Sequence, residues 1–189
     1  MGWAIVIIVG IILLLVIGVG LWVMGAYNRL VNLKERVRAG WSHIEVLLKR
    51  RHDLIPNLVE TVRGYATHES ETMESVIAAR NQAVSAKGVQ QQAQAEGMLT
   101  QALGRLFAVA EAYPDLKANQ NFMQLQNELT ETENGIASQR QGYNNIVTTY
   151  NTTIQQFPTN LIAGPFGFQA SPFFEVTSTG EREAPKVQF

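Results

Sequence analysis

A run of 24 residues, Trp3 to Ala26, contains no charged side chain and leaves this chain few ways to fold in water. As a helix, the run would rise about 36 Å, which exceeds the roughly 30 Å hydrocarbon core of a bilayer. Trp3 and Trp22 lie near its ends and Tyr27 follows it, and such amphipathic rings favour the headgroup region. The sequence therefore predicts a transmembrane anchor over residues 1–28, with Trp3, Trp22, Tyr27 and Arg29 at the membrane interfaces.

A cleaved signal peptide is the alternative interpretation of this run. A signal peptide has a basic n-region, an apolar stretch of about 7–15 residues and a small-residue cleavage site. Here only Met1 and Gly2 precede the apolar run, and the first basic residue is Arg29. A retained anchor fits these flanks better.

Charge is distributed unevenly along the rest of the chain. The stretch Arg29 to Arg51 holds seven basic and two acidic residues, whereas Glu111 to Glu133 holds five acidic and one basic. The positive-inside rule places everything after Tyr27 in the cytoplasm and the N-terminus outside. The basic stretch either binds anionic headgroups or serves only as this topology signal. Because the acidic stretch can neutralise it, we expect no nucleic-acid partner.

Beyond the anchor, the spacing of apolar residues predicts that the same helix continues. Two rows recur every seven residues, namely Val37, Ile44, Leu58 and Tyr65, and Trp41, Leu48, Ile55 and Val62. Arg51 occupies a position of the first row, so its guanidinium must meet a carboxylate or extend to solvent. Pro56 predicts a kink rather than a break, because the apolar register continues to about Gln82, and Gly88 is the expected end.

Two further helices are expected. The first starts within residues 89–94 and ends at Pro114. The second is capped by Asn119 or Asn121, ends at Pro158, and carries a seam at seven-residue intervals: Phe122, Leu129, Ile136, Tyr143, Tyr150 and Phe157. An antiparallel return of this helix would bring Glu128, Glu131 and Glu133 near Arg50 and Arg51. The fold class is therefore all-α, with an anchor over 1–28, a helical bundle over 29–157 and an extended aromatic tail over 158–189.

Several motifs resemble those of the LemA family of bacterial membrane proteins. They are Tyr27 to Val31, Ala39 to Ile44, Leu48 to Val59, Glu111 to Asn119, Thr132 to Asn134, and Tyr143-Asn144. The resemblance implies a single-pass protein of the bacterial inner membrane, with its N-terminus out and a cytoplasmic bundle of long antiparallel helices. The family includes relatives in magnetosome formation.

Residues suited to catalysis are sparse. His43, His52 and His68 lack metal-ligand spacing, the chain has no cysteine, and Ser42 lacks the setting of a nucleophile. We therefore expect no enzyme activity, no cofactor and no metal. The best polar constellation is Arg50, Arg51, Asp53 and Pro56, which either pairs charges within the bundle or docks a partner.

Two functions fit these features. In the first, the protein is a membrane scaffold that associates with itself, since long helices with apolar seams offer surfaces for repeated subunits. In the second, it is an adaptor that tethers another protein near Pro56. Membrane lipid is a partner in both cases.

Overall fold

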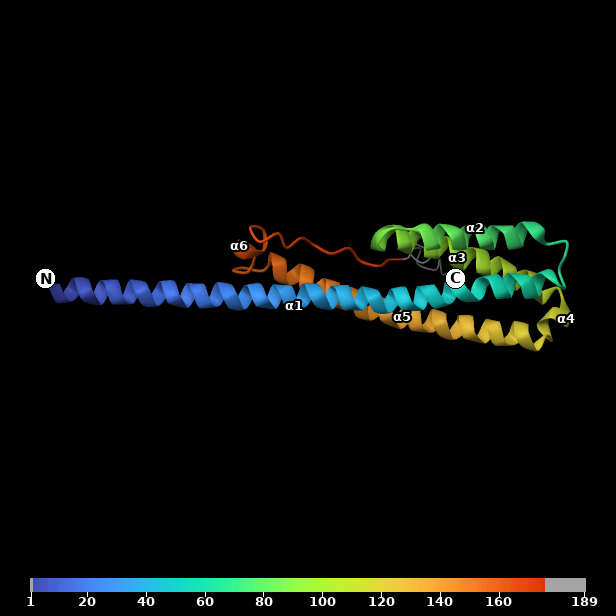
Figure 1. The fold of residues 1–189 in the computed structure, drawn as a ribbon, viewed down its shortest axis with the longest axis horizontal. Coiled ribbons are helices and arrows are strands. Elements are labelled where there is room, and N and C mark those ends of the chain that lie inside the picture. The colour runs from blue at the N-terminus through green and yellow to red at the C-terminus, as the bar shows by residue number, and fades with distance from the viewer. Residues whose placement is uncertain (1, 176–189) are drawn as a thin grey trace, which may run out of the picture. The chain divides into compact units, whose positions relative to one another are not determined.

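The computed structural model describes residues 2–175, and all of the secondary structure in that range is helical. The helices are α1 (Gly2–Arg63), α2 (Ser70–Ser85), α3 (Gly88–Glu111), α4 (Pro114–Lys117), α5 (Gln120–Gln155) and α6 (Asn160–Ala163), as Figure 1 shows. The all-α class with a long N-terminal apolar helix is therefore confirmed. The last fourteen positions of the expected tail, 176–189, lie outside the described residues.

The chain divides into two compact units, and both α1 and α5 contribute to each of them. Among the described residues, the first unit comprises residues 2–40 and Asn145–Ser171, and the second comprises Trp41–Asn144 and residues 172–175.

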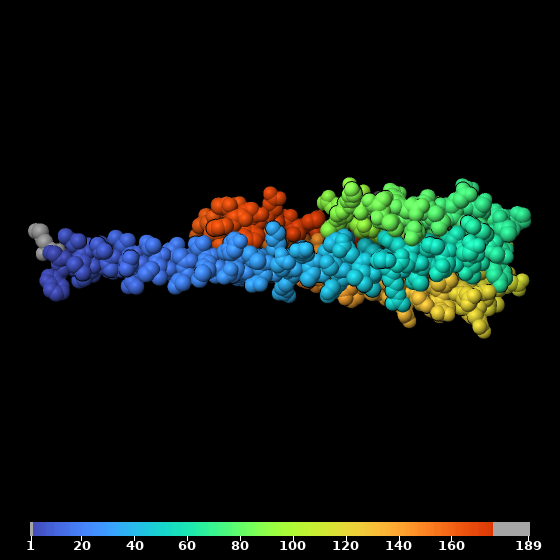
Figure 2. All heavy atoms as spheres, in the orientation of Figure 1, coloured from blue at the N-terminus to red at the C-terminus, as the bar shows by residue number. Residues whose placement is uncertain are grey.

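In the first unit, the apolar run forms the start of α1 and is uncovered. Every large apolar side chain from Trp3 to Leu21 is exposed, and the first buried side chain of α1 among the described residues is Leu30. In Figure 2 no other segment covers the dark blue start of α1 on the face in view. Among residues 2–175, α1 is the one helix long and apolar enough to cross a membrane.

The second unit buries its apolar side chains between α1, α2, α3 and α5. Its core includes Ile55, Leu58 and Val62 of α1, Met73 and Val76 of α2, Leu99 and Leu106 of α3, and Phe122 and Leu129 of α5. Within this unit α5 runs antiparallel to α1, because the ring of Trp41 contacts that of Tyr143 whereas Tyr65, further along α1's direction, accepts a hydrogen bond from Asn119, which precedes α5.

The expectation that the first helix continues to about Gln82 is wrong. α1 ends at Arg63, where the N–H groups of Tyr65 and Ala66 both donate to the carbonyl of Val62, and α2 begins only at Ser70. Met73 and Val76 are nevertheless buried, as their spacing predicts. They reach the same core from a separate helix, because apolar spacing reports burial and not chain direction.

α5 starts where the sequence predicts, and five of the six predicted positions of its seam are buried. Asn119 caps α5, since its side-chain oxygen accepts the N–H of Phe122 at 3.0 Å. The first five seam positions, Phe122 to Tyr150, are buried. Phe157 is 79% exposed, because α5 ends at Gln155 and the helical register ends with it.

Candidate functional site

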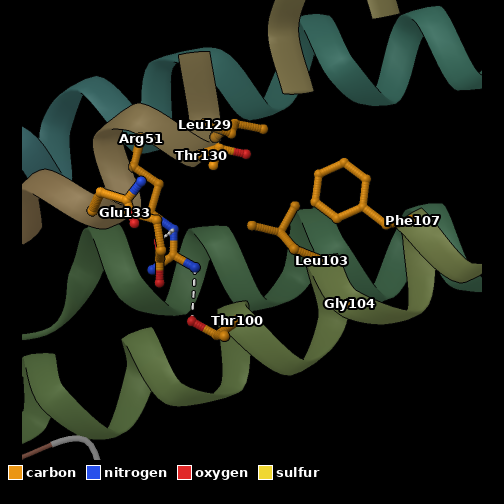
Figure 3. A pocket seen from close by; sticks show the side chains of 9 residues that line it. Arg51, Thr100, Leu103, Gly104, Phe107, Leu129, Thr130 and Glu133 are labelled. Carbon is orange, nitrogen blue, oxygen red and sulfur yellow. Dashed lines mark hydrogen bonds and ion pairs between the residues drawn. The ribbon is translucent and has the colours of Figure 1, made fainter. Parts of the chain in front are cut away.

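Arg51 of α1 is buried among polar groups of two other helices. Its side chain is 3% exposed; Nη1 donates to Glu96 Oε2 at 3.0 Å, and Nη2 donates to Thr100 Oγ1 at 2.8 Å. Its Nε lies 3.3 Å from Glu133 Oε2, within ion-pair distance but without hydrogen-bond geometry. Glu96 and Thr100 belong to α3 and Glu133 to α5, so this guanidinium ties three helices together (Figure 3).

Glu96 is the centre of this cluster, because its second oxygen is also occupied. Oε1 lies 2.7 Å from His52 Nε2 and accepts a hydrogen bond from Gln92 at 2.8 Å. A carboxylate with 3% side-chain exposure needs such partners, since an unpaired buried charge costs several kcal/mol. Arg51, His52 and Gln92 supply them from two helices.

Pro56 leaves one carbonyl of α1 without its usual partner. Proline has no N–H, so the carbonyl four residues earlier, that of His52, loses its helical hydrogen bond. Arg80 of α2 replaces it, with Nε donating to the His52 carbonyl at 2.9 Å. α1 therefore continues through Pro56, and the proline creates an acceptor that binds a second helix.

The structure does not bring the four residues of the predicted cluster together. Arg50 is half exposed, and its nearest carboxylate oxygen, on Glu128, lies 3.9 Å away. Asp53 faces solvent and accepts a hydrogen bond from Lys49 at 2.6 Å. This hydrogen bond holds the pKa of the Asp53 carboxyl below its ordinary value. Of the predicted acidic residues, Glu128 and Glu133 do approach Arg50 and Arg51.

A hollow of about 290 Å³ opens beside Arg51. Leu103, Phe107 and Leu129 form its apolar wall, and Arg51 and Glu133 lie at one end (Figure 3). Gly104 also lines it, and a Cβ at that position would meet nothing within 4 Å. The hollow can take a small apolar group that carries one hydrogen-bonding or charged atom.

Glu96, Thr100, Gln92 and Arg80 are the members of this site that the sequence did not single out. Glu96 had a signal, because it continues the apolar row of Leu99, Leu103 and Leu106 backwards at alternating spacings of three and four. A lone carboxylate in such a row is the complement of the lone guanidinium in the row of α1.

The predicted membrane-interface residues lie along the exposed part of α1. Trp3 is 86% exposed, and Trp22 and Arg29 are exposed as well. Tyr27 contacts two rings of the C-terminal segment edge-on, with centroid distances of 5.2 Å to Phe166 and 5.6 Å to Phe168.

The Tyr143-Asn144 motif binds residues 172–174 within the second unit. Tyr143 donates to the Pro172 carbonyl at 2.8 Å, and Asn144 makes two hydrogen bonds to the backbone of Phe174. The ring of Phe174 is fully buried, 5.4 Å from that of Trp41. Burial raises the pKa of the Tyr143 hydroxyl. These tyrosine and asparagine residues therefore bind the chain's own extended segment.

Residues 2–175 contain no group of three or more histidine, cysteine or acidic side chains that could hold a metal ion. An uncovered apolar helix long enough to cross a membrane, followed by further packed helices, fits a membrane-associated helical protein. The family is evident from comparison with known sequences: the model of the LemA family matches residues 40–189, and the chain belongs to this family. The membership predicted from the motifs is thus confirmed.

The relatives include magnetosome proteins. The chain is 28% identical over 181 residues to "Magnetosome protein MamQ 2" of Paramagnetospirillum magneticum and to "Magnetosome protein MamQ" of Magnetospirillum gryphiswaldense, with 82% of this chain and 66% of each relative covered. It is 29% identical over 153 residues to "Protein LemA" of Metamycoplasma hominis, with 79% and 69% covered. The chain thus spans just under two thirds of the length of the magnetosome relatives.

Proposed function

We propose that this protein is a non-enzymatic, membrane-anchored helical scaffold that associates with itself and organises or shapes the bacterial inner membrane. The supporting observation is the uncovered start of α1, where the apolar side chains and Gly10, Gly18 and Gly20 all face open space. In a bilayer, small residues let a second helix approach closely. The names of the magnetosome relatives fit a role in organising a cellular structure.

The proposal includes the topology. The basic residues that follow the apolar run support a single pass with the N-terminus outside and the later helices in the cytoplasm. The division into an anchor over 1–28, a bundle over 29–157 and a tail over 158–189 remains a prediction, as does the coiled-coil character of the packing.

Self-association is tested by co-purification of two differently tagged copies of the full chain. When the copies are co-expressed, capture of one tag from membranes in mild detergent should recover the other. When the copies are expressed separately and mixed after extraction, recovery should fall, which excludes association caused by detergent. Absence of the second tag under both conditions would contradict self-association.

The alternative function is a membrane-tethered adaptor, and the hollow beside Arg51 favours it. A partner side chain that fills this hollow would contact Leu103, Phe107 and Arg51 without displacing a helix. Of the predicted cluster of Arg50, Arg51, Asp53 and Pro56, Arg51 is the residue that lines this hollow.

Gly104→Leu tests the adaptor. Gly104 lines the hollow and a Cβ there would meet no atom within 4 Å, so the leucine side chain has room to occupy the hollow. It should abolish any specific partner that co-purifies with the wild-type chain, and it should leave the helical circular dichroism unchanged. Gly142→Leu is the matched control, since that glycine also faces open space and does not line the hollow. Unchanged co-purification in Gly104→Leu would count against the adaptor.

A further inference from the structure

The turn that follows α5 exposes an unusual amount of apolar surface. Phe157 is 79% exposed, Leu161 of α6 is 62% exposed and Phe166 is 55% exposed. From Gln141 to Phe174 the chain contains no Asp, Glu, Lys or Arg. Three large exposed apolar side chains within an uncharged segment indicate a binding surface rather than an ordinary solvent-facing turn. We call Phe157, Leu161 and Phe166 the apolar turn.

The apolar turn lies beside the part of α1 that directly follows the apolar run Trp3 to Ala26. Phe166 and Phe168 both contact Tyr27, the residue directly after that run, and Lys34 Nζ lies 5.8 Å from the ring centroid of Phe168. Figure 1 shows α6 alongside α1 within the first unit. A bilayer that covers the run up to Ala26 would bring its headgroups to the level of Tyr27.

Several backbone groups of the turn form hydrogen bonds within it. Phe166 donates to the Ile162 carbonyl at 3.1 Å, and Phe168 donates to the Ala163 carbonyl at 2.9 Å. Gly167 has a φ of +74°, which lets the chain reverse between these two hydrogen bonds. These internal hydrogen bonds lower the cost of moving this backbone into a less polar region, because the N–H groups involved are already paired.

From these observations we propose that the apolar turn is a second membrane contact. Phe157, Leu161 and Phe166 insert at the boundary between headgroups and acyl chains on the face where the anchor emerges. Arg29 and Lys34 of α1 lie next to anionic headgroups there. The protein thus holds the bilayer at two points, the spanning helix and the turn. This inference rests on the proposed membrane anchor and does not depend on self-association.

Fluorescent labels at single cysteines test this contact directly, because the natural chain has no cysteine. Leu161→Cys in the full chain is labelled with an environment-sensitive dye and reconstituted into vesicles of phosphatidylcholine and phosphatidylglycerol. The emission should be blue-shifted, protected from aqueous iodide, and quenched when the acyl chains are brominated. A label at Phe157→Cys provides a second position with the same expected result.

Two further labels control the measurement. Val84→Cys lies on α2 in the second unit, is also exposed, and should be quenched by iodide but not by brominated lipid. Leu13→Cys lies within the apolar run and should be quenched by brominated lipid. If Leu13 fails this test, the membrane anchor and the second contact are both wrong.

If only Leu13 is quenched and Leu161 behaves like Val84, the second contact is overturned and the anchor stands. A Leu161 label that is protected from iodide and also insensitive to brominated lipid would overturn it as well. That result would show that protein, most simply a second copy of this chain, covers the apolar turn.

Discussion

At the scale of single residues, the fold depends on two polar groups that the interior of a helical protein would ordinarily exclude. The buried guanidinium of Arg51 needs Glu96 and Glu133, and the His52 carbonyl freed by Pro56 needs Arg80. Each requirement is met from another helix. Such pairs fix which helices meet and in which register, because the cost of leaving them unpaired is high.

Arg51→Met should destabilise the protein strongly, because it leaves Glu96 buried without its cation. The expected loss is about 3–5 kcal/mol of unfolding free energy. The measurement is urea unfolding of the full chain in mild detergent, followed by helical circular dichroism. Arg50→Met is the matched control, since Arg50 is half exposed and should cost below about 1 kcal/mol. Equal losses for the two variants would contradict the assigned role of Arg51.

Arg80→Met should show a dependence on Pro56 that ordinary surface arginines lack. In the natural chain the substitution leaves the His52 carbonyl without a donor, at an expected cost of about 1–2 kcal/mol. In a Pro56→Ala background the new backbone N–H can donate to that carbonyl, so the same substitution should cost about 1 kcal/mol less. Unfolding of the four proteins of this cycle gives the coupling energy. A coupling of zero would show that Arg80 does not replace the missing helical bond.

At the scale of elements, much of the helical organisation could be predicted from sequence. Apolar spacing, Pro114 and the Asn119 cap located α3 and α5 closely, because these signals act locally. The turn between α1 and α2 was missed, since the side chains on both sides of it face one core and keep one spacing. The need of Arg51 for a carboxylate was predictable, and the contribution of Arg80 was not. It depends on how α2 folds back against α1.

The Tyr143 hydroxyl, which donates a hydrogen bond to the Pro172 carbonyl, makes the stability of the second unit sensitive to alkaline pH. Burial raises the pKa of Tyr143 above its unfolded value, so its stabilising contribution is complete below pH about 10 and is lost as pH rises through the folded-state pKa. Tyr143→Phe should lose about 1 kcal/mol at neutral pH, because the Pro172 carbonyl loses its donor. Its stability should then fall less steeply than wild type above pH about 10.

Tyr150→Phe is the matched control for this pH series. Burial also raises the pKa of Tyr150, yet its hydroxyl has no hydrogen-bond partner within the described part of the chain. The Phe variant should therefore keep or gain stability at neutral pH and also become less sensitive to alkali. Unfolding midpoints across this pH range decide both cases, and a neutral-pH loss in Tyr150→Phe equal to that in Tyr143→Phe would contradict the difference.

At the scale of the whole molecule, a helix long and apolar enough to cross a membrane leads into helices that pair charges between them. Part of the basic stretch meets the acidic stretch within the second unit, where Arg50 approaches Glu128 and Arg51 approaches Glu133. These pairs lie within the second unit, so Arg29, Lys34 and the apolar surface of the first unit remain for contact with lipid.

The mass of the full-length protein in mild detergent decides whether it is a self-associating membrane scaffold. Light scattering on a sizing column gives the protein mass after subtraction of the bound detergent, and electron microscopy of the same peak gives its shape. We expect one uniform particle with a mass several times that of the 21.0 kDa chain. A folded, strictly monomeric protein would contradict the scaffold and leave the adaptor as the working hypothesis.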